Sequence, residues 1–175
     1  KGKVHEDFVV LKGIEYDTCD AGHIICIMPE GVKMRLLELR GLPVSALIDF
    51  VHRHGGILGP AHPCGEKYLS FTNTKKFYKS PEIIKRFDFM EAFNACEPVE
   101  SNREALKLVQ KYKKPGIGGS DSHKLDCVGL GYTELPERVT CETELISLIR
   151  KKVPIEAGGT IYGKTTKDKI GKANK

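Results

Sequence analysis

Short apolar segments alternate with helical patterns along this chain, and that alternation limits its fold more than any other feature. Apolar runs at residues 8–14 and 23–28 predict strands, and the turn-forming residues between them favour a hairpin. Residues 45–54 carry apolar side chains at helical spacing, with Ser45 as an N-cap. Further strands are predicted at residues 57–61, 87–94, around 117, 128–133 and 153–157, and further helices at 102–112, with Asn102 as the N-cap, and at 141–151. Strands separated by helices of about 10 to 15 residues indicate parallel β-α units.

Length and composition place the chain among globular proteins. Its 175 residues are typical of one domain, and 40% hydrophobic with 29% charged residues excludes collagen, coiled coil and wholesale disorder. No apolar run approaches the roughly 20 residues that cross a bilayer, and no signal-peptide pattern is present, so no membrane association is predicted. The chain opens on Lys1 rather than Met, which suggests that a leading segment is missing.

Charge and cysteine usage narrow the class further. The net charge of +5 is concentrated near the end, so we divide the chain into a domain at residues 1–160 and a Lys-rich tail at 161–175, interpreted as a solvated terminus. No nucleic-acid-reading motif is present. The six cysteines include no C-x-x-C pair, which predicts free thiols in a reducing, cytoplasmic compartment and argues against zinc-ribbon or thioredoxin chemistry.

Chemically reactive side chains recur at the ends of the predicted strands. Glu15, His62, Asp121 and His123 hold these positions, and the carboxyl ends of parallel strands meet at one edge of a sheet. Imidazole and carboxylate together suit Zn, Mn or Fe. Each residue also has a structural interpretation: a carboxylate paired with lysine, an imidazole bonded to backbone, or a capped loop. A nucleotide-binding turn at residues 116–119 is a weak alternative, since the G-x-G-x-x-G spacing is absent.

An ordered set of short motifs carries a resemblance to a known family. The motifs are GIE at 13–15, GHII at 22–25, GGI at 55–57 leading to AHP at 61–63, FMEAFN at 89–94 and GGSDSH at 118–123. Together they resemble the PHP (polymerase and histidinol phosphatase) superfamily, and most closely its metal-dependent phosphoesterases. The resemblance runs from about residue 8 to residue 133, and GGSDSH is its most specific part.

The resemblance implies a distorted (β/α)7 barrel with two or three divalent ions at the carboxyl ends of its strands. By position, Glu15 would bridge two ions, His23 and His62 would each bind one, and Asp121 and His123 would complete the site. A core position for His23 is nearly as well supported, because the turn before it leaves the register of its strand ambiguous. The ions implied are Zn, Mn or Fe.

The sequence departs from the family pattern at its start. Family members begin with a His-x-His strand followed by an Asp-His element, and this sequence has neither. We therefore expect those ligands upstream of Lys1 and a barrel that lacks its first strands. An incomplete barrel would leave the strand at residues 8–14 with an unpaired edge, which predicts self-association. The chain alone is expected to bind metal weakly, at fewer than two sites, and to have little activity.

The function implied by the complete site is hydrolysis of a phosphoester. Metal-activated water would be the nucleophile, and Glu15, His62, Asp121 and His123 would be the catalytic residues. The expected substrate is a phosphorylated small molecule or a nucleotide, while a nucleic-acid substrate has no supporting motif. Two alternatives stay open at this point: a non-catalytic PHP-like binding or regulatory module, and an amidohydrolase-type hydrolase. Amidohydrolase-type sites usually end on a lone Asp, whereas Asp121 and His123 lie two residues apart.

Overall fold

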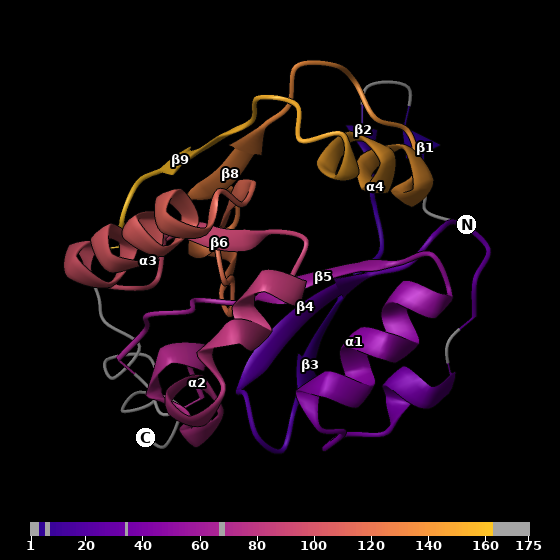
Figure 1. Cartoon of the computed structure of the whole chain (residues 1–175). Helices are drawn as coiled ribbons and strands as arrows, with labels where there is room; N and C mark the ends of the chain where they lie inside the picture. Colours follow the sequence, from indigo (N-terminus) through magenta and orange to yellow (C-terminus); the bar gives the residue numbers. More distant parts are fainter. Residues whose placement is uncertain (1–3, 6–7, 34, 67–68, 163–175) are drawn as a thin grey trace, which may run out of the picture.

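The strands of the chain form four short sheets (Figure 1). The computed structural model describes residues 4–5, 8–33, 35–66 and 69–162. The strands are β1 (Val4–His5), β2 (Phe8–Val9), β3 (Ile14–Asp17), β4 (His23–Ile27), β5 (Ile57–Pro60), β6 (Met90–Asn94), β7 (Gly116–Gly119), β8 (Gly131–Glu134) and β9 (Glu156–Gly159). The α-helices are α1 (Val44–Arg53), α2 (Lys75–Lys79), α3 (Val99–Tyr112) and α4 (Glu142–Arg150), and the 3-10 helices are η1 (Arg35–Glu38), η2 (Phe71–Asn73), η3 (Pro81–Arg86) and η4 (Leu125–Cys127).

The predicted (β/α)7 barrel is wrong. Within the described ranges each sheet has two or three strands and none closes into a barrel, and of the paired strands only β6 and β7 run parallel. Alternation of apolar and helical segments does not by itself set strand direction. Helix α1 lies between β4 and β5, yet these two strands are antiparallel. The predicted β-α-β unit occurs at β6-α3-β7, and the fold is a mixed α/β arrangement of short sheets.

The predicted hairpin is confirmed, with a different first strand. Residues 8–14 do not form one strand: β2 pairs with β1, and β3 pairs with β4. In the β3-β4-β5 order, β3 and β5 are the edge strands. The hairpin turn requires Gly22, whose φ is 72° and whose added Cβ would lie 1.7 Å from the carbonyl oxygen of Leu69. The turn thereby packs against the segment that follows His62, and the His23 amide donates to the same Leu69 carbonyl.

The β3-β4-β5 sheet is covered on both faces. Alternate residues such as Tyr16, Ile24 and Leu58 face the main core, which includes α1. Helix α1 buries Val44, Leu47, Ile48 and Val51 completely, at a gain of roughly 1.5–3 kcal/mol for each such side chain. It begins at Val44 rather than at Ser45, which is not its cap. The other face carries a smaller apolar cluster that includes Phe89, just before β6, and residues of α4.

Close backbone contact joins this sheet to β6. An added Cβ at Gly59 would lie 2.2 Å from the carbonyl oxygen of Phe89, so only glycine allows β5 to approach so near. The amide of Asp88 donates to the Leu58 carbonyl, and the Leu58 amide donates to the Asp88 carboxylate. These contacts fix the position of β6 relative to the end of β5.

The second half of the chain is shifted from its predicted boundaries. Helix α3 begins at Val99, so Asn102 lies inside it; the Asn102 side chain instead bonds both backbone polar groups of Asn94. Strands β8 and β9 form three residues downstream of where the predicted strands begin, and they pair antiparallel. Of the predicted Lys-rich tail, residues 163–175 lie outside the described residues.

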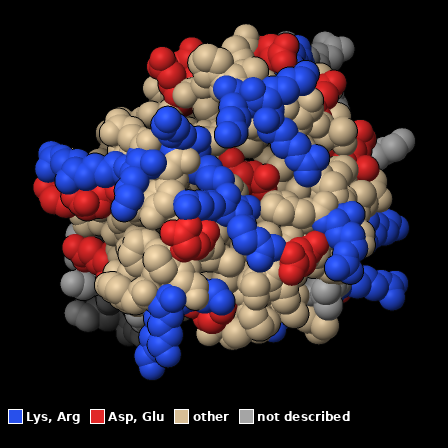
Figure 2. All heavy atoms as spheres, viewed as in Figure 1, with Lys and Arg blue, Asp and Glu red and all other residues tan. Residues whose placement is uncertain are grey.

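The surface is strongly basic in places. Lys and Arg side chains form a band across the middle of the face shown in Figure 2, with acidic side chains among and around them. None of the described helices combines the length and apolarity needed to span a membrane.

A candidate metal site of Glu15, His23 and His62

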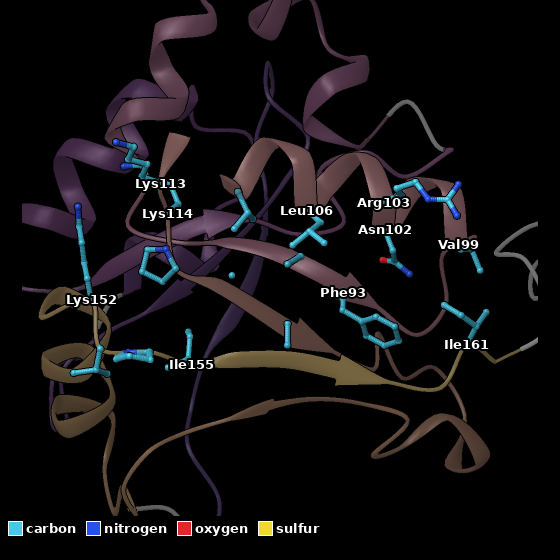
Figure 3. Close-up of a pocket in the computed structure, with 17 residues that line it drawn as sticks. Phe93, Val99, Asn102, Arg103, Leu106, Lys113, Lys114, Lys152, Ile155 and Ile161 are labelled. Carbon is cyan, nitrogen blue, oxygen red and sulfur yellow. The ribbon is translucent and has the colours of Figure 1, made fainter. Parts of the chain in front are cut away.

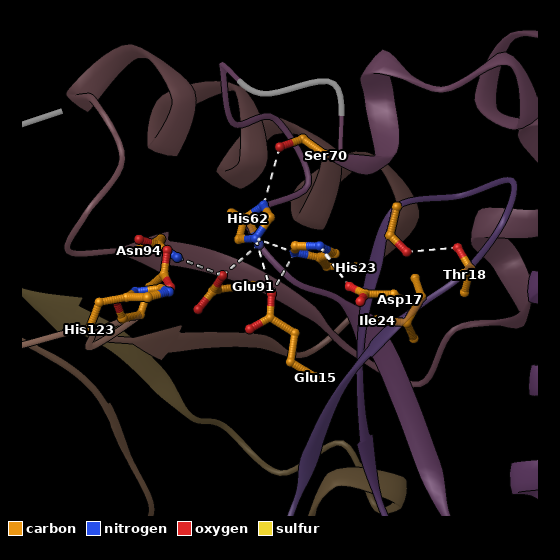
Figure 4. Close-up of polar contacts among 12 residues, drawn as sticks. Glu15, Asp17, Thr18, His23, Ile24, His62, Ser70, Glu91, Asn94 and His123 are labelled. Carbon is orange, nitrogen blue, oxygen red and sulfur yellow. Dashed lines mark hydrogen bonds and ion pairs between the residues drawn. The ribbon is translucent and has the colours of Figure 1, made fainter. Parts of the chain in front are cut away.

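Three side chains converge at one end of the β3-β4-β5 sheet. Oε1 of Glu15 lies 2.8 Å from Nδ1 of His23 and 3.2 Å from Nε2 of His62. The two ring nitrogens are themselves 3.3 Å apart (Figure 4). One atom from each residue therefore points toward a common centre, and these three residues form a group able to hold a metal ion.

Antiparallel pairing explains this convergence. His23 begins β4 and His62 follows the end of β5, and antiparallel strands place those two ends together. In the hairpin, His23 lies opposite Asp17, and Glu15 is two residues before Asp17 on the same face. Glu15 thus lies inside a strand, not at the strand end that the sequence suggested. The ambiguous register of His23 is settled: its ring faces Glu15 on one side and Asp17 on the other.

His62 is held in a strained backbone conformation. Its φ is 30°, and it is one of four described non-glycine residues with positive φ, together with Lys113, Asp121 and Lys152. The two lysines follow helix ends, where this conformation is ordinary. His62 and Asp121 do not, and such strain persists only where surrounding contacts enforce it.

Those contacts surround the His62 side chain and backbone. The His62 amide donates to Oε2 of Glu91 at 2.6 Å, and Nδ1 of the ring lies 3.1 Å from the Ser70 hydroxyl. The Ser70 contact directs Nε2 toward Glu15, as a partner on the far ring nitrogen usually does for a metal-binding histidine. The His62 residue is only 8% exposed, so its orientation is fixed by packing as well as by hydrogen bonds.

The carboxylates set the protonation of the cluster. Hydrogen bonds from His23 and His62 hold the pKa of Glu15 far below its usual value of 4.5, so this carboxylate is ionised. Burial alone would lower the pKa of His62, but the hydrogen bond to Glu15 and the charges of nearby carboxylates, Asp121 among them, outweigh burial and raise it.

The donor set fits a divalent cation. A tetrahedral Zn²⁺ with Zn–N bonds of about 2.0–2.1 Å separates its nitrogen ligands by about 3.3 Å. The separations of 2.8 to 3.3 Å among the three donor atoms are close to that spacing. Two imidazoles and one ionised carboxylate are also the ligand types that Zn, Mn and Fe accept.

Neither Asp121 nor His123 belongs to the three-residue group, and His123 lies on the other side of His62 from His23 in Figure 4. The Asp121 side chain is 11% exposed, and its charge acts on both His62 and Glu91. The His123 side chain is 67% exposed, with Nδ1 2.9 Å from the Asp121 carbonyl oxygen. His123 lies on the Asn94 side of the cluster in Figure 4.

Glu91 is a site residue that sequence reasoning did not single out. Glu91 is only 4% exposed. Its carboxylate accepts hydrogen bonds from the His62 amide and, at 3.1 Å, from Nδ2 of Asn94. Burial raises the pKa of Glu91 to about 7, although these hydrogen bonds oppose the rise. Gly119 makes room for it, because an added Cβ there would lie 2.5 Å from Oε1 of Glu91. The signal in the sequence was an acidic residue inside an otherwise apolar strand.

One family model matches part of this chain. Residues 99–154 match a family model described as PHP-associated. This match relates the chain to the PHP superfamily; the matched segment includes Asp121 and His123 but not Glu15, His23 or His62.

The comparison with solved structures provides information on the fold alone. No curated protein matches the sequence. The crystal structure of PsfC from Pseudomonas syringae PB-5123 is similar, with a TM-score of 0.61 and 18% identity over 85% of this chain. The chain spans 58% of the length of that structure.

Proposed function

We propose that this chain carries a PHP-type metal centre that hydrolyses a phosphoester. The observation that carries the proposal is the convergence of Glu15, His23 and His62 on one point, in a chain related to the PHP superfamily. Zn, Mn or Fe fits these ligands, with two or three ions in a complete site. When bound, such ions stabilise negative charge on phosphate oxygens and activate water as the nucleophile.

The residues of the chain divide the work of this site. His23 and His62 are nitrogen ligands, and Glu15 is an oxygen ligand whose contacts to both rings use Oε1. Its second oxygen, Oε2, would make Glu15 suited to hold a second ion. In this proposal Asp121 and His123 would supply the remaining ligands. Asp17 orients the His23 ring through its contact of 2.9 Å with Nε2.

The proposed substrate is a phosphorylated small molecule or a nucleotide. Of the lysines after His62, Lys75 and Lys79 are exposed and could contact a phosphate, while Lys76 is paired with Asp20. All six cysteines are free thiols, which supports a reducing compartment such as the cytoplasm.

Metal binding and hydrolysis are tested separately. Mn²⁺ or Zn²⁺ is titrated into the chain by calorimetry, and turnover of p-nitrophenyl phosphate and bis(p-nitrophenyl) phosphate is followed with and without metal. His62→Ala removes one ligand and should lower metal affinity and metal-dependent turnover by at least about 100-fold. His54→Ala is the matched control, because His54 is exposed at the end of α1 and its ring contacts only Phe50 among the described residues, through a hydrogen bond to the carbonyl and a ring contact.

The outcomes separate three interpretations. Saturable metal binding and turnover that are both lost in His62→Ala support the proposal. Metal binding that depends on His62 without turnover of either substrate would favour the non-catalytic module. Equal metal affinity in His62→Ala and His54→Ala would overturn the metal site itself.

A further inference from the structure

A long groove lies between α3 and β9 (Figure 3), and its lining includes none of Glu15, His23 and His62. It has a volume of about 670 Å³, within the range of small-molecule sites. Its middle is apolar: Leu106 projects from α3, Phe93 from β6, and Ile155 precedes β9. Leu106 and Val99 are about half exposed, so α3 presents apolar surface to solvent along this groove.

The charged side chains that line the groove are all basic. Its lining includes Arg103, Lys113, Lys114 and Lys152, and no Asp or Glu. Lys114 is satisfied by the carbonyl oxygens of Lys85 and Phe87. In the part of the chain that the structure describes, Lys113 and Lys152 have no ion pair and no side-chain hydrogen bond.

The two unpaired lysines occupy backbone positions that favour glycine. Lys113 has φ 50° and Lys152 has φ 52°, each just after a helix ends. Glycine is the usual residue there because the left-handed conformation costs a side chain about 1 kcal/mol. A cation near a helix C-terminus recovers part of that cost. Lys152 lies close enough to Lys114 for the two charges to repel, although the charge of Asp88 acts on Lys114 more strongly.

We propose that this groove binds an amphipathic organic anion, with its carboxylate or phosphate head between Lys113 and Lys152 and its apolar body along Leu106, Phe93 and Ile155. Ten residues of α3 separate Lys113 from Arg103, which gives the groove a length of about 15 Å, enough for a medium-length acyl chain.

Matched probes separate the two parts of this recognition. Octanoate is titrated into the full chain by calorimetry in the presence of EDTA, so that its carboxylate cannot bind through a metal at Glu15, His23 and His62. Octanol lacks the charge, octylamine reverses it, and acetate lacks the apolar body. We expect octanoate to bind at one site and each of the other three to bind at least about tenfold more weakly.

Variants then locate the site. Lys113→Gln combined with Lys152→Gln should weaken octanoate about tenfold. The control is Lys111→Gln combined with Lys151→Gln, which removes the same charge from neighbouring positions outside the groove. Leu106→Asp should abolish binding by placing a carboxylate on the apolar wall, and its exposure keeps the fold intact. Equal binding of octanoate and octylamine, equal affinity in the two double variants, or no octanoate binding at millimolar concentration would each overturn the proposal.

Discussion

Replacement of Gly119 by alanine tests how the GGSDSH motif supports the site. The new Cβ would lie 2.5 Å from Oε1 of Glu91, well inside van der Waals contact, so the Glu91 carboxylate must move. That movement strains a buried contact, at about 1–3 kcal/mol, and weakens the hydrogen bonds from the His62 amide and the Asn94 side chain. We expect a loss of about 2–3 kcal/mol in the free energy of unfolding, which lowers Tm by about 4–12 °C for a domain of this size.

The measurement is urea unfolding followed by far-ultraviolet circular dichroism. Gly13→Ala is the matched control, because the nearest atom to its added Cβ lies at 3.4 Å, an ordinary contact, and its loss should stay within about 0.5 kcal/mol. Glu91→Ala should also reduce the effect of Gly119→Ala, since the clash needs both side chains. If Gly119→Ala is as stable as Gly13→Ala, or if the effects of Gly119→Ala and Glu91→Ala simply add, the reasoning is refuted.

Four further predictions concern pH, the core and the sheet edge. Metal affinity should fall as pH drops through the raised pKa of His62, because a protonated ring cannot bind metal; calorimetry between pH 5 and 8 that shows a flat profile would contradict this. In the metal-free chain the contact between Glu15 and His62 stabilises the fold, and this stabilisation is complete between their ordinary pKa values, 4.5 and 6.5. The stabilisation is lost above the raised pKa of His62, and it is lost in acid as Glu15 protonates. Urea unfolding at several pH values would reveal both losses. Leu47→Ala, at a fully buried position, should cost about 2–5 kcal/mol of unfolding free energy, whereas Leu39→Ala, at a position 62% exposed, should cost under about 0.5; similar values for both would show that α1 is not packed as described. We also propose that the edge strand β3 lets two chains associate, and a single monomer mass at every concentration in sedimentation equilibrium would rule this out.

The sequence predicted segments better than it predicted their directions. Helices α1 and α4 form within a few residues of the expected ranges, because apolar spacing reports directly on which face is buried. Strand direction depends on long-range pairing, which apolar spacing does not encode, so antiparallel β4 and β5 were taken as part of a parallel barrel. The pairing of Asn102 with the Asn94 backbone was missed for the same reason.

In the candidate site too, the sequence predicted residues better than it predicted how the strands bring them together. His62 and Glu15 were selected as residues at strand ends, and they do meet, but they meet through antiparallel pairing rather than at the edge of a parallel sheet. Glu91 was overlooked because an acidic residue inside an otherwise apolar strand does not by itself identify the partners of its carboxylate. Its role is visible only in its contacts with the His62 amide and Asn94.

The close approach of β5 and β6 at Gly59 has a consequence for how the ligand set can vary. The β3-β4-β5 sheet and the residues just after it supply all three donors, but the backbone of His62 is anchored to Glu91 on β6. The β3-β4-β5 sheet therefore supplies the donor atoms, and β6 orients the His62 ring. Substitutions along β6 that shift Glu91 by a fraction of an ångström would change the orientation of the His62 ring, although Glu15, His23 and His62 themselves stay unchanged. Metal preference could thus drift between related chains with identical ligands.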